Sequence, residues 1–355
     1  LAHEFGHFYS GDTALGPWIY NTRQAIIRTV VNLSGVSSLI QAPFKSYAMM
    51  FLRVTNTISR HQEFSADGLA ARVVGADICI SSLKKVHKHG RAFQAYWTQE
   101  YLPVINNGFQ PPLLEGFTRF VEAPKIAEAL EKLYDEDLNK EKSDPYDSHP
   151  SLKERIAALE GLPDEEAERE GPAAITLLPD VEAMEDWLLD AIARDKSKIQ
   201  NLASIDWKEV DEKVHIPRWR KNAETYRPVL KEFTAGELPG ALKQVDKLFA
   251  RIAELGKLLP PGVSPNQVHP HNKLQVCGQV FGGGLAVILT EKGWQVSIPP
   301  GEEIKLRKGK LEILPFNLLT DLEAGKISAD DWDATCAAAG IADTPLVLSG
   351  EISSA

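Results

Sequence analysis

The chain begins Leu1-Ala2-His3-Glu4-Phe5-Gly6-His7-Phe8, and this stretch decides how the rest of the sequence is interpreted. On an α-helix, residues four apart lie one turn above each other on the same face. His3 and His7 can therefore direct two imidazoles at one metal ion, and Glu4 can reach a water on that ion. The stretch predicts a helix that supplies two ligands of a metal centre, so a third ligand has to come from elsewhere.

Residues 59–70 are predicted to supply that third ligand. Alanines and other helix-forming residues predict a helix here, with Glu63 and Asp67 four residues apart on one face. A carboxylate is the expected partner of two histidines in a catalytic zinc site, which keeps its fourth position for water. Glu63 is therefore the predicted ligand, and Asp67 is suited to fixing the orientation of a ligand imidazole. The alternative is an ordinary exposed acidic pair.

Composition narrows the class of protein. A chain of 355 residues is long enough for two or three domains, and 43% hydrophobic with 25% charged residues is typical of soluble globular proteins. With 39 basic and 49 acidic residues the net charge is −10, which gives no basic footprint for nucleic acid. The three cysteines, Cys79, Cys277 and Cys336, are far apart and are expected to be small core residues.

The sequence starts at Leu1, inside the predicted ligand helix. We therefore expect the chain to be a fragment that is truncated at its N-terminus. The missing segment is expected to hold a signal, membrane-spanning helices or an edge strand that would form part of a substrate cleft.

Residues 13–60 are apolar but interrupted. Their longest uncharged run, residues 29–44, contains Asn32 and Pro43 and falls short of the ~18 apolar residues that a spanning helix needs. The pattern predicts a buried helical hairpin, and a hairpin that contacts a bilayer is the alternative.

A third motif follows at His149-Pro150-Ser151, where a loop is predicted to open a helix that carries Arg155 and Ile156. With these residues in place, three motifs occur in order along residues 1–160. The set resembles the HtpX and CAAX-prenyl-protease type of integral-membrane and membrane-associated zinc metallopeptidases, of the Glu-zincin class. The motifs are His3-Glu4-x-x-His7 with Gly11-Asp12, Arg60-x-x-Glu63-Phe64-x-Ala66-Asp67, and His149-Pro150-Ser151-x-x-x-Arg155-Ile156.

The resemblance implies a role for each of these residues. One Zn²⁺ per chain would be held by His3, His7 and Glu63, with Glu4 as the general base. Asp67 and Arg155 would support the ligands, and His149 would stabilise the oxyanion. The implied substrate is a protein or peptide, the implied setting is membrane-protein quality control or processing, and the full-length protein is expected to associate with a membrane.

The predicted fold class is a mainly α zincin-like catalytic domain followed by an appended α+β module with a small antiparallel sheet. The predicted limits are residues 1–160 for the catalytic domain, 161–176 for an acidic linker, 177–260 for a helical region and 261–355 for the α+β module. Within that module, alternating apolar residues predict strands at 274–280, 285–289, 294–298 and 312–314. No chemistry is predicted for residues 175–355.

A function of a different class is the alternative: a membrane-associated assembly or chaperone factor that acts mainly by binding through the C-terminal module. Replacing Glu4 by Gln separates the two, because an enzyme would lose cleavage and a binding protein would keep its function.

Overall fold

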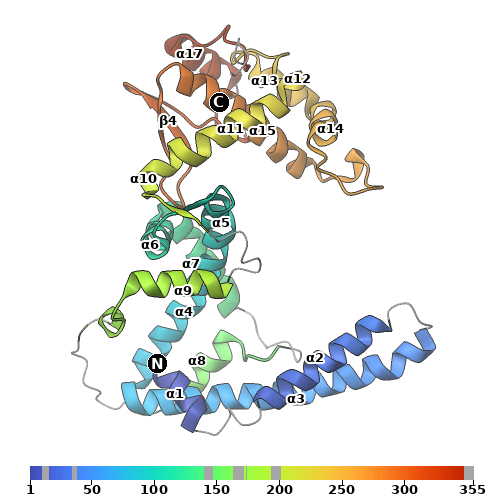
Figure 1. Ribbon diagram of the computed structural model, residues 1–355, viewed down its shortest axis with the longest axis vertical. Helices are drawn as coiled ribbons and strands as arrows, with labels where there is room; N and C mark the ends of the chain where they lie inside the picture. The colour runs from blue at the N-terminus through green and yellow to red at the C-terminus, as the bar shows by residue number, and fades with distance from the viewer. Residues whose placement is uncertain are drawn as a thin grey trace. The chain divides into compact units, whose positions relative to one another are not determined.

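The computed structural model describes residues 1–9, 16–33, 38–139, 147–162, 172, 174–192 and 201–347. They belong to two compact units, Leu1–Ala95 with Lys125–Met184, and Tyr96–Pro124 with Glu185–Ala355 (Figure 1). Residues 96–124 thus group with the C-terminal part of the chain. The domain limits predicted from the sequence stay a prediction, and most of the predicted linker lies outside the described residues.

The first unit is built from helices, as the predicted mainly α fold class requires. Three helices have residues in both units: α4 (Ala76–Tyr96), α7 (Pro124–Leu138) and α9 (Val181–Ile192). The other described helices of the first unit are α1 (Ala2–Tyr9), α2 (Gly16–Asn32), α3 (Ser38–Val74), α8 (Leu152–Glu160) and the 3-10 turn η3 (Ala174–Leu177).

The packing of α1 against α3 positions the predicted ligands, and it depends on a glycine. A Cβ atom at Gly6 would lie 2.8 Å from the Cα of Ala66, closer than real contacts allow. The glycine therefore lets the two backbones approach each other. Farther along α3, Ala70 and Ala71 pack with Leu159 of α8 in a small apolar core. Helix α8 begins at a capping box in which Ser151 accepts from the backbone N–H of Glu154.

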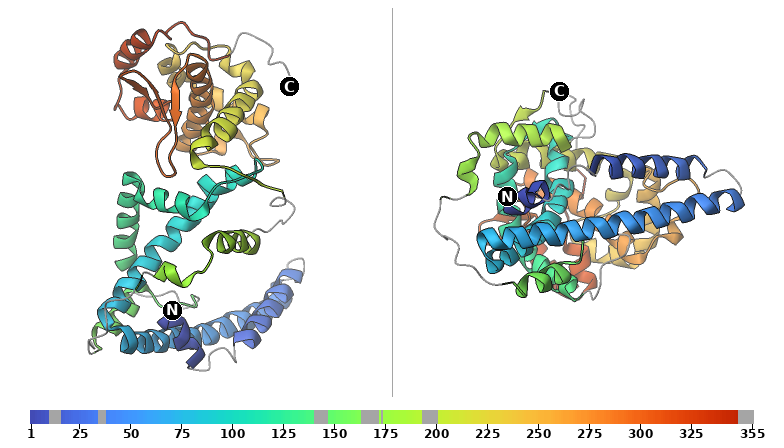
Figure 2. Two further views of the ribbon diagram at one scale, coloured as in Figure 1. Left: turned by 60° about the vertical axis from the view of Figure 1, so that its left-hand side comes forward. Right: turned by 90° about the horizontal axis from the view of Figure 1, so that it is seen from below.

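The predicted helical hairpin is confirmed, but its predicted burial is wrong. Helix α2 lies along the N-terminal half of α3 in both views (Figures 1 and 2). Only the facing side chains are covered, among them Ile26 and Leu52. Many large apolar side chains instead face solvent, including Trp18, Leu39 and Met50. The apolar composition of this stretch identified the two helices, but it could not show whether another part of the chain covers them.

The second unit holds the remaining described elements. Its N-terminal part contains the π-helical turn η2 (Trp97–Tyr101), α5 (Leu102–Ile105), β1 (Phe109–Gln110) and α6 (Leu113–Glu122). Its C-terminal part contains β2 (Ala203–Ser204), α10 (Trp207–Val210), the π-helical turn η5 (Asp211–His215), α11 (Ile216–Thr225), α12 (Arg227–Leu230), α13 (Leu238–Ala241), η6 (Leu242–Gln244), α14 (Val245–Gly256), η7 (Pro265–Gln267), α15 (Pro270–Glu291), β3 (Gln295–Ser297), β4 (Lys305–Lys308), β5 (Leu311–Ile313), α16 (Leu318–Glu323) and α17 (Ala329–Ala339).

Helix α15 is the centre of this unit's core and corrects two predicted strands. Residues 274–280 and 285–289, predicted as strands, lie within this one helix of 22 residues. It packs against α11, α14 and α16, and its buried side chains include Leu274, Leu285 and Leu289. Because a helix surrounded on most sides is apolar around much of its circumference, a short window of its sequence resembles a buried strand.

The predicted small antiparallel sheet is confirmed. Strands β3, β4 and β5 form a three-stranded sheet in that order, with Val296 opposite Leu306 and Leu306 opposite Ile313. Leu306 and Ile313 face the core. A second sheet, absent from the sequence prediction, pairs β1 with β2 in parallel.

Within the described residues, one helix is long and apolar enough to cross a membrane, and it is α15. Of its most apolar window, 72% is buried inside the protein, as expected for a core helix.

Candidate metal centre

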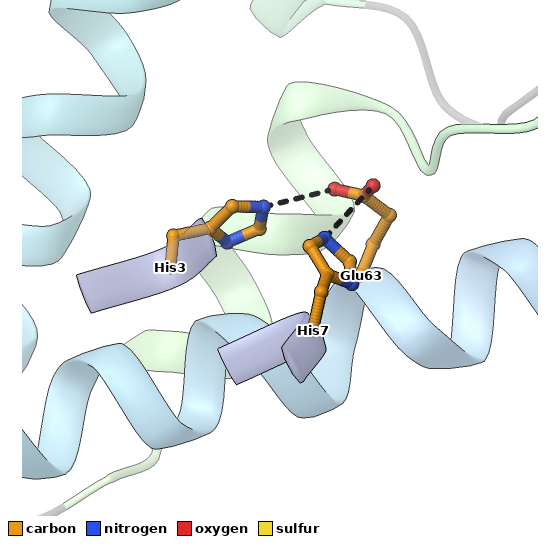
Figure 3. A group of neighbouring side chains, drawn as sticks. All are labelled: His3, His7 and Glu63. Carbon is orange, nitrogen blue, oxygen red and sulfur yellow. Dashed lines mark ion pairs between the residues drawn. The ribbon is translucent and has the colours of Figure 1, made fainter. Parts of the chain in front are cut away.

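Three of the predicted residues meet where α1 crosses α3. His3 and His7 come from one face of α1, and Glu63 reaches them from α3 (Figure 3). The Nε2 atom of His3 lies 3.6 Å from Oε2 of Glu63, and the Nε2 atom of His7 lies 3.7 Å from Oε1 of the same carboxylate. One potential ligand atom from each of the three residues lies within 4.8 Å of the others.

These separations fit zinc. Tetrahedral coordination at about 2.0–2.1 Å places neighbouring ligand atoms about 3.4 Å apart, close to the distances found here. Two imidazoles and one carboxylate are also a ligand set of catalytic zinc sites that leave one position open. Among the described residues, this is the one group of three or more His, Cys, Asp and Glu side chains with metal-binding geometry.

Asp67 orients one of the imidazoles. Its Oδ1 lies 2.8 Å from Nδ1 of His3, and the aspartate is only 1% exposed. A carboxylate that accepts a hydrogen bond from Nδ1–H leaves Nε2 free of its proton and able to bind a metal. The structure thus places Asp67 against His3, one of the two imidazoles predicted to bind the metal.

Arg155 of α8 joins the two acidic residues of α3. Its Nε and one terminal nitrogen donate to the two oxygens of Asp67, each at 2.7 Å, and its other terminal nitrogen lies 3.1 Å from Oε2 of Glu63. Burial alone would raise the pKa of Asp67, but hydrogen bonds from Arg155 and His3 outweigh it and lower the pKa. The arginine thus keeps a buried carboxylate ionised.

Glu63 is held ionised in the same way. It is 8% exposed, and burial acts to raise its pKa, yet the hydrogen bond with His149 and the charge of Arg155 lower it below its usual value. An ionised carboxylate is the form that binds a metal ion.

His149 lies beside this group on the loop before α8. Its Nδ1 is 3.2 Å from Oε1 of Glu63, while most of its side chain is exposed. The interaction with Glu63 raises the pKa of His149. The loop is also held by Arg60 of α3, which donates to the backbone oxygen of Asp147 at 3.0 Å.

Glu4 follows His3 on α1 and is exposed. The residues Gly11 and Asp12 of the first motif lie outside the described residues. The structure therefore brings together His3, His7, Glu63, Asp67, His149 and Arg155, six of the seven predicted site residues, with Glu4 adjacent in sequence to a ligand candidate.

One feature of the centre was not predicted from the sequence: the close helix crossing at Gly6, which had a signal in the small residues Gly6 and Ala66. The resemblance implied that Arg155 supports the ligands, and the structure places this arginine against both Glu63 and Asp67.

Comparison with known proteins agrees with this geometry. The model of peptidase family M48 matches residues 1–162, which confirms the resemblance seen in the sequence and implies zinc metallopeptidase activity. No curated protein and no solved structure matches the chain.

Proposed function

We propose that this chain, whose residues 1–162 match peptidase family M48, is a zinc-dependent endopeptidase that uses Glu4 as its general base. The observation that carries the proposal is the convergence of His3, His7 and Glu63, the ligand set of a catalytic zinc site, with one ligand atom of each within 4.8 Å of the others. The ion would supply a Lewis acid for the peptide carbonyl and a water whose pKa is lowered towards ~7.

The proton steps are assigned to Glu4. Its carboxylate would accept a proton from the attacking water and then deliver it to the leaving amine. Its exposed position on α1, next to His3, leaves it accessible to both groups. Asp67 and Arg155 would keep His3 and Glu63 oriented throughout, since Asp67 is buried and the half-buried Arg155 donates two hydrogen bonds to it.

His149 is assigned to the oxyanion of the tetrahedral intermediate. A protonated imidazole can donate a hydrogen bond to developing negative charge. Two observations support this role: the side chain lies beside the ligand set, and its pKa is raised by Glu63.

Membrane association is proposed through the hairpin of α2 and α3. Between Asp12 and Glu63 the sequence contains no Asp or Glu and five basic residues, in a chain whose net charge is −10. The same segment exposes Trp18, Leu39 and Met50. Exposed apolar side chains with basic residues are typical of segments that lie at the surface of an anionic bilayer. This setting supports a role in membrane-protein quality control or processing.

Replacing Glu4 by Gln tests the proposed reaction. We expect one zinc ion per chain to remain while the rate of casein cleavage falls about 10²–10⁴-fold, because the amide cannot accept the proton. Glu160→Gln, which removes an exposed carboxylate at the end of α8, is the matched control and should cleave normally. Normal cleavage by Glu4→Gln would show that another group is the base and would favour a binding function.

His149→Ala separates the oxyanion role from metal binding. It should retain zinc and lose about 10²–10³-fold in rate, the scale for removal of one oxyanion donor. His7→Ala should lose the zinc itself. If zinc content fell to the same extent in both variants, His149 would be a ligand and its assigned role would be wrong.

A further inference from the structure

The second unit contains a groove that the proposed peptidase reaction does not use. It has a volume of about 760 Å³ and lies between α11, α15 and the segment that begins α16. Apolar side chains form part of its wall, and the rings of Trp219 and Phe316 pack with their centroids 5.3 Å apart. All of its lining residues belong to this one unit.

One charge faces the groove, and it is positive. Arg218 lines it, and no Asp or Glu is among the described residues that do. Burial lowers the pKa of Arg218, and Glu100 offsets this only in part. Glu100 is itself buried enough for its pKa to be raised, and one of its oxygens accepts from the backbone N–H of Gly301. Among the described residues Glu100 is the acidic group that acts on Arg218, and it compensates the charge only in part, so the groove favours a negative group.

A glycine keeps the groove open. Gly283 of α15 is buried, yet a Cβ atom added to it would meet nothing within 4 Å. Its neighbour Gly282 differs, because a Cβ there would lie 2.7 Å from the backbone oxygen of Pro315. Gly282 therefore serves helix packing, whereas Gly283 borders empty space that a ligand can enter.

Amide side chains line the rim. Asn222 of α11 and Gln275 and Gln279 of α15 all reach the groove and are exposed. Each amide carries both a donor and an acceptor, which is the pairing that a peptide backbone offers in return. A hydrocarbon chain offers these amides no hydrogen bond, so the rim favours a peptide over a fatty acid.

We propose that this groove binds the C-terminal tail of a protein, with the free carboxylate at Arg218, the backbone at the amide rim and apolar side chains against Trp219. Arg218 would hold the carboxylate through charge-assisted hydrogen bonds, which are the strong ones. In combination with the proposed peptidase the groove would recruit substrates by their ends. The binding itself does not require the peptidase activity.

Peptide arrays test the proposal with the full chain carrying Glu4→Gln, so that peptides are not cut. In the first array the peptides are attached through their N-termini, are randomised at their last four positions and end in free carboxylates. In the second array the same peptides end in carboxamides. The best peptide is then labelled with fluorescein at its N-terminus and titrated by fluorescence anisotropy.

We expect amidation and Arg218→Gln each to weaken binding by about tenfold or more, the scale of a hydrogen bond to a charged group. Arg218→Lys should weaken it less, since the charge remains. Lys221→Gln, which removes an exposed charge from the same helix outside the groove, is the control and should bind within about twofold of the parent.

Gly283 provides a second readout should Arg218→Gln prove unstable. Gly283→Leu should abolish binding by filling the groove, and Gly283→Ala should weaken it less, while circular dichroism shows both folded. The proposal is overturned if the free chain binds neither array, if it binds both equally, or if Gly283→Leu binds normally. Binding of sodium decanoate, measured by calorimetry, to a chain that binds no peptide would assign the groove to a fatty acid and also overturn the proposal. If the chain binds C-terminal tails but the wild type cleaves no protein, this proposal stands and the proposed peptidase activity is wrong.

Discussion

Helices α3 and α15 are both long, with 37 and 22 residues, and they bury opposite kinds of side chain. Helix α3 buries Glu63 and Asp67 while it exposes Leu39 and Met50. Helix α15 buries almost only apolar residues and glycines. By hydropathy α15 is the membrane candidate, yet it is the core of its unit. The apolar content of a helix alone therefore does not show whether its apolar side chains pack inside the protein or remain exposed on its surface.

The difference also shows how charge is buried. An ionised carboxylate in a protein interior is costly unless a partner compensates it. On α3 the partners are Arg155 and His3, and both acidic residues stay ionised. In the second unit, one oxygen of Asp211 and Nδ1 of His215 are buried and form no hydrogen bond with any described residue. Burial raises the pKa of Asp211 and lowers that of His215, so each favours its neutral form. The two buried acidic residues of α3 are therefore arranged to stay charged, which is the form in which a carboxylate can bind a metal ion.

Removal of Arg155 should give the largest loss of stability. In the metal-free protein, Arg155→Met leaves Asp67 buried without its cation, and we expect the free energy of unfolding to fall by about 3–5 kcal/mol. Urea denaturation in the presence of a chelator measures it. Arg72→Met, an exposed basic residue on α3, is the control. Equal losses in the two variants would show that the buried carboxylates do not depend on Arg155.

Truncation in the apolar core of α15 should come next. Leu285 is fully buried, so Leu285→Ala should lower the free energy of unfolding of its unit by about 2–5 kcal/mol. Zinc content per folded chain should not change, because no ligand is touched. Leu255→Ala, at a partly exposed position of α14, should cost much less. A comparable loss at Leu255 would contradict the central place of α15 in this core.

The unpaired groups of the second unit should appear in the pH dependence of stability. Burial raises the pKa of Asp211 to about 6. Between about pH 4 and 6 the folded chain therefore keeps a proton that the unfolded chain releases. The free energy of unfolding falls as pH rises through this range. Burial and Arg218 lower the pKa of His215 to about 4, so its contribution rises with pH between about 4 and 6.5. The two slopes oppose each other in the wild type.

In Asp211→Asn the contribution of Asp211 to the pH dependence of stability is lost, and that of His215, which rises with pH, remains. Its unfolding free energy should increase with pH more steeply than that of the wild type, and at pH 7 it should be more stable by roughly 1 kcal/mol. Glu212→Gln, at the exposed neighbouring position, should follow the wild type. A variant profile parallel to that of the wild type would mean that Asp211 does not titrate in this range.

The smallest effect on stability is expected on the exposed hairpin. Leu39→Ser combined with Met50→Ser should change the free energy of unfolding by less than about 0.5 kcal/mol per site. Cosedimentation with vesicles of phosphatidylglycerol and phosphatidylcholine should nevertheless weaken by roughly tenfold. Val86→Ser, an exposed site on α4, should leave vesicle binding unchanged. If the double substitution left vesicle binding unchanged, the proposal that the hairpin contacts the membrane would be wrong.

The sequence signal for the candidate metal centre is local. The histidines of α1 and the acidic residues of α3 each repeat at four residues, which places them on one helix face in any fold that keeps the helix. Their meeting across the two helices was inferred from the chemistry of zinc ligands, and the structure places the side chains within reach.

The failures have a different physical origin. Residues 274–289 alternate well enough to resemble strands, but their burial comes from helices α11, α14 and α16, which the local pattern cannot show. Likewise, His87 of α4 pairs with buried Asp137 of α7 at 2.6 Å across 50 residues of sequence, a contact that no local pattern indicates. The exposure of the hairpin was missed for the same reason. Burial depends on partners distant in the chain, and a single sequence carries no local signal for them.

Zinc analysis of the purified chain and of Glu63→Ala, by plasma mass spectrometry and X-ray absorption, tests the central claim most directly. We predict one zinc per wild-type chain, with nitrogen and oxygen ligands at about 2.0–2.2 Å, and a loss of most of the zinc in Glu63→Ala. A Glu63→Ala protein that retains a full zinc with an unchanged spectrum, or a wild-type spectrum with sulfur ligands at about 2.3 Å, would contradict the metal centre described here.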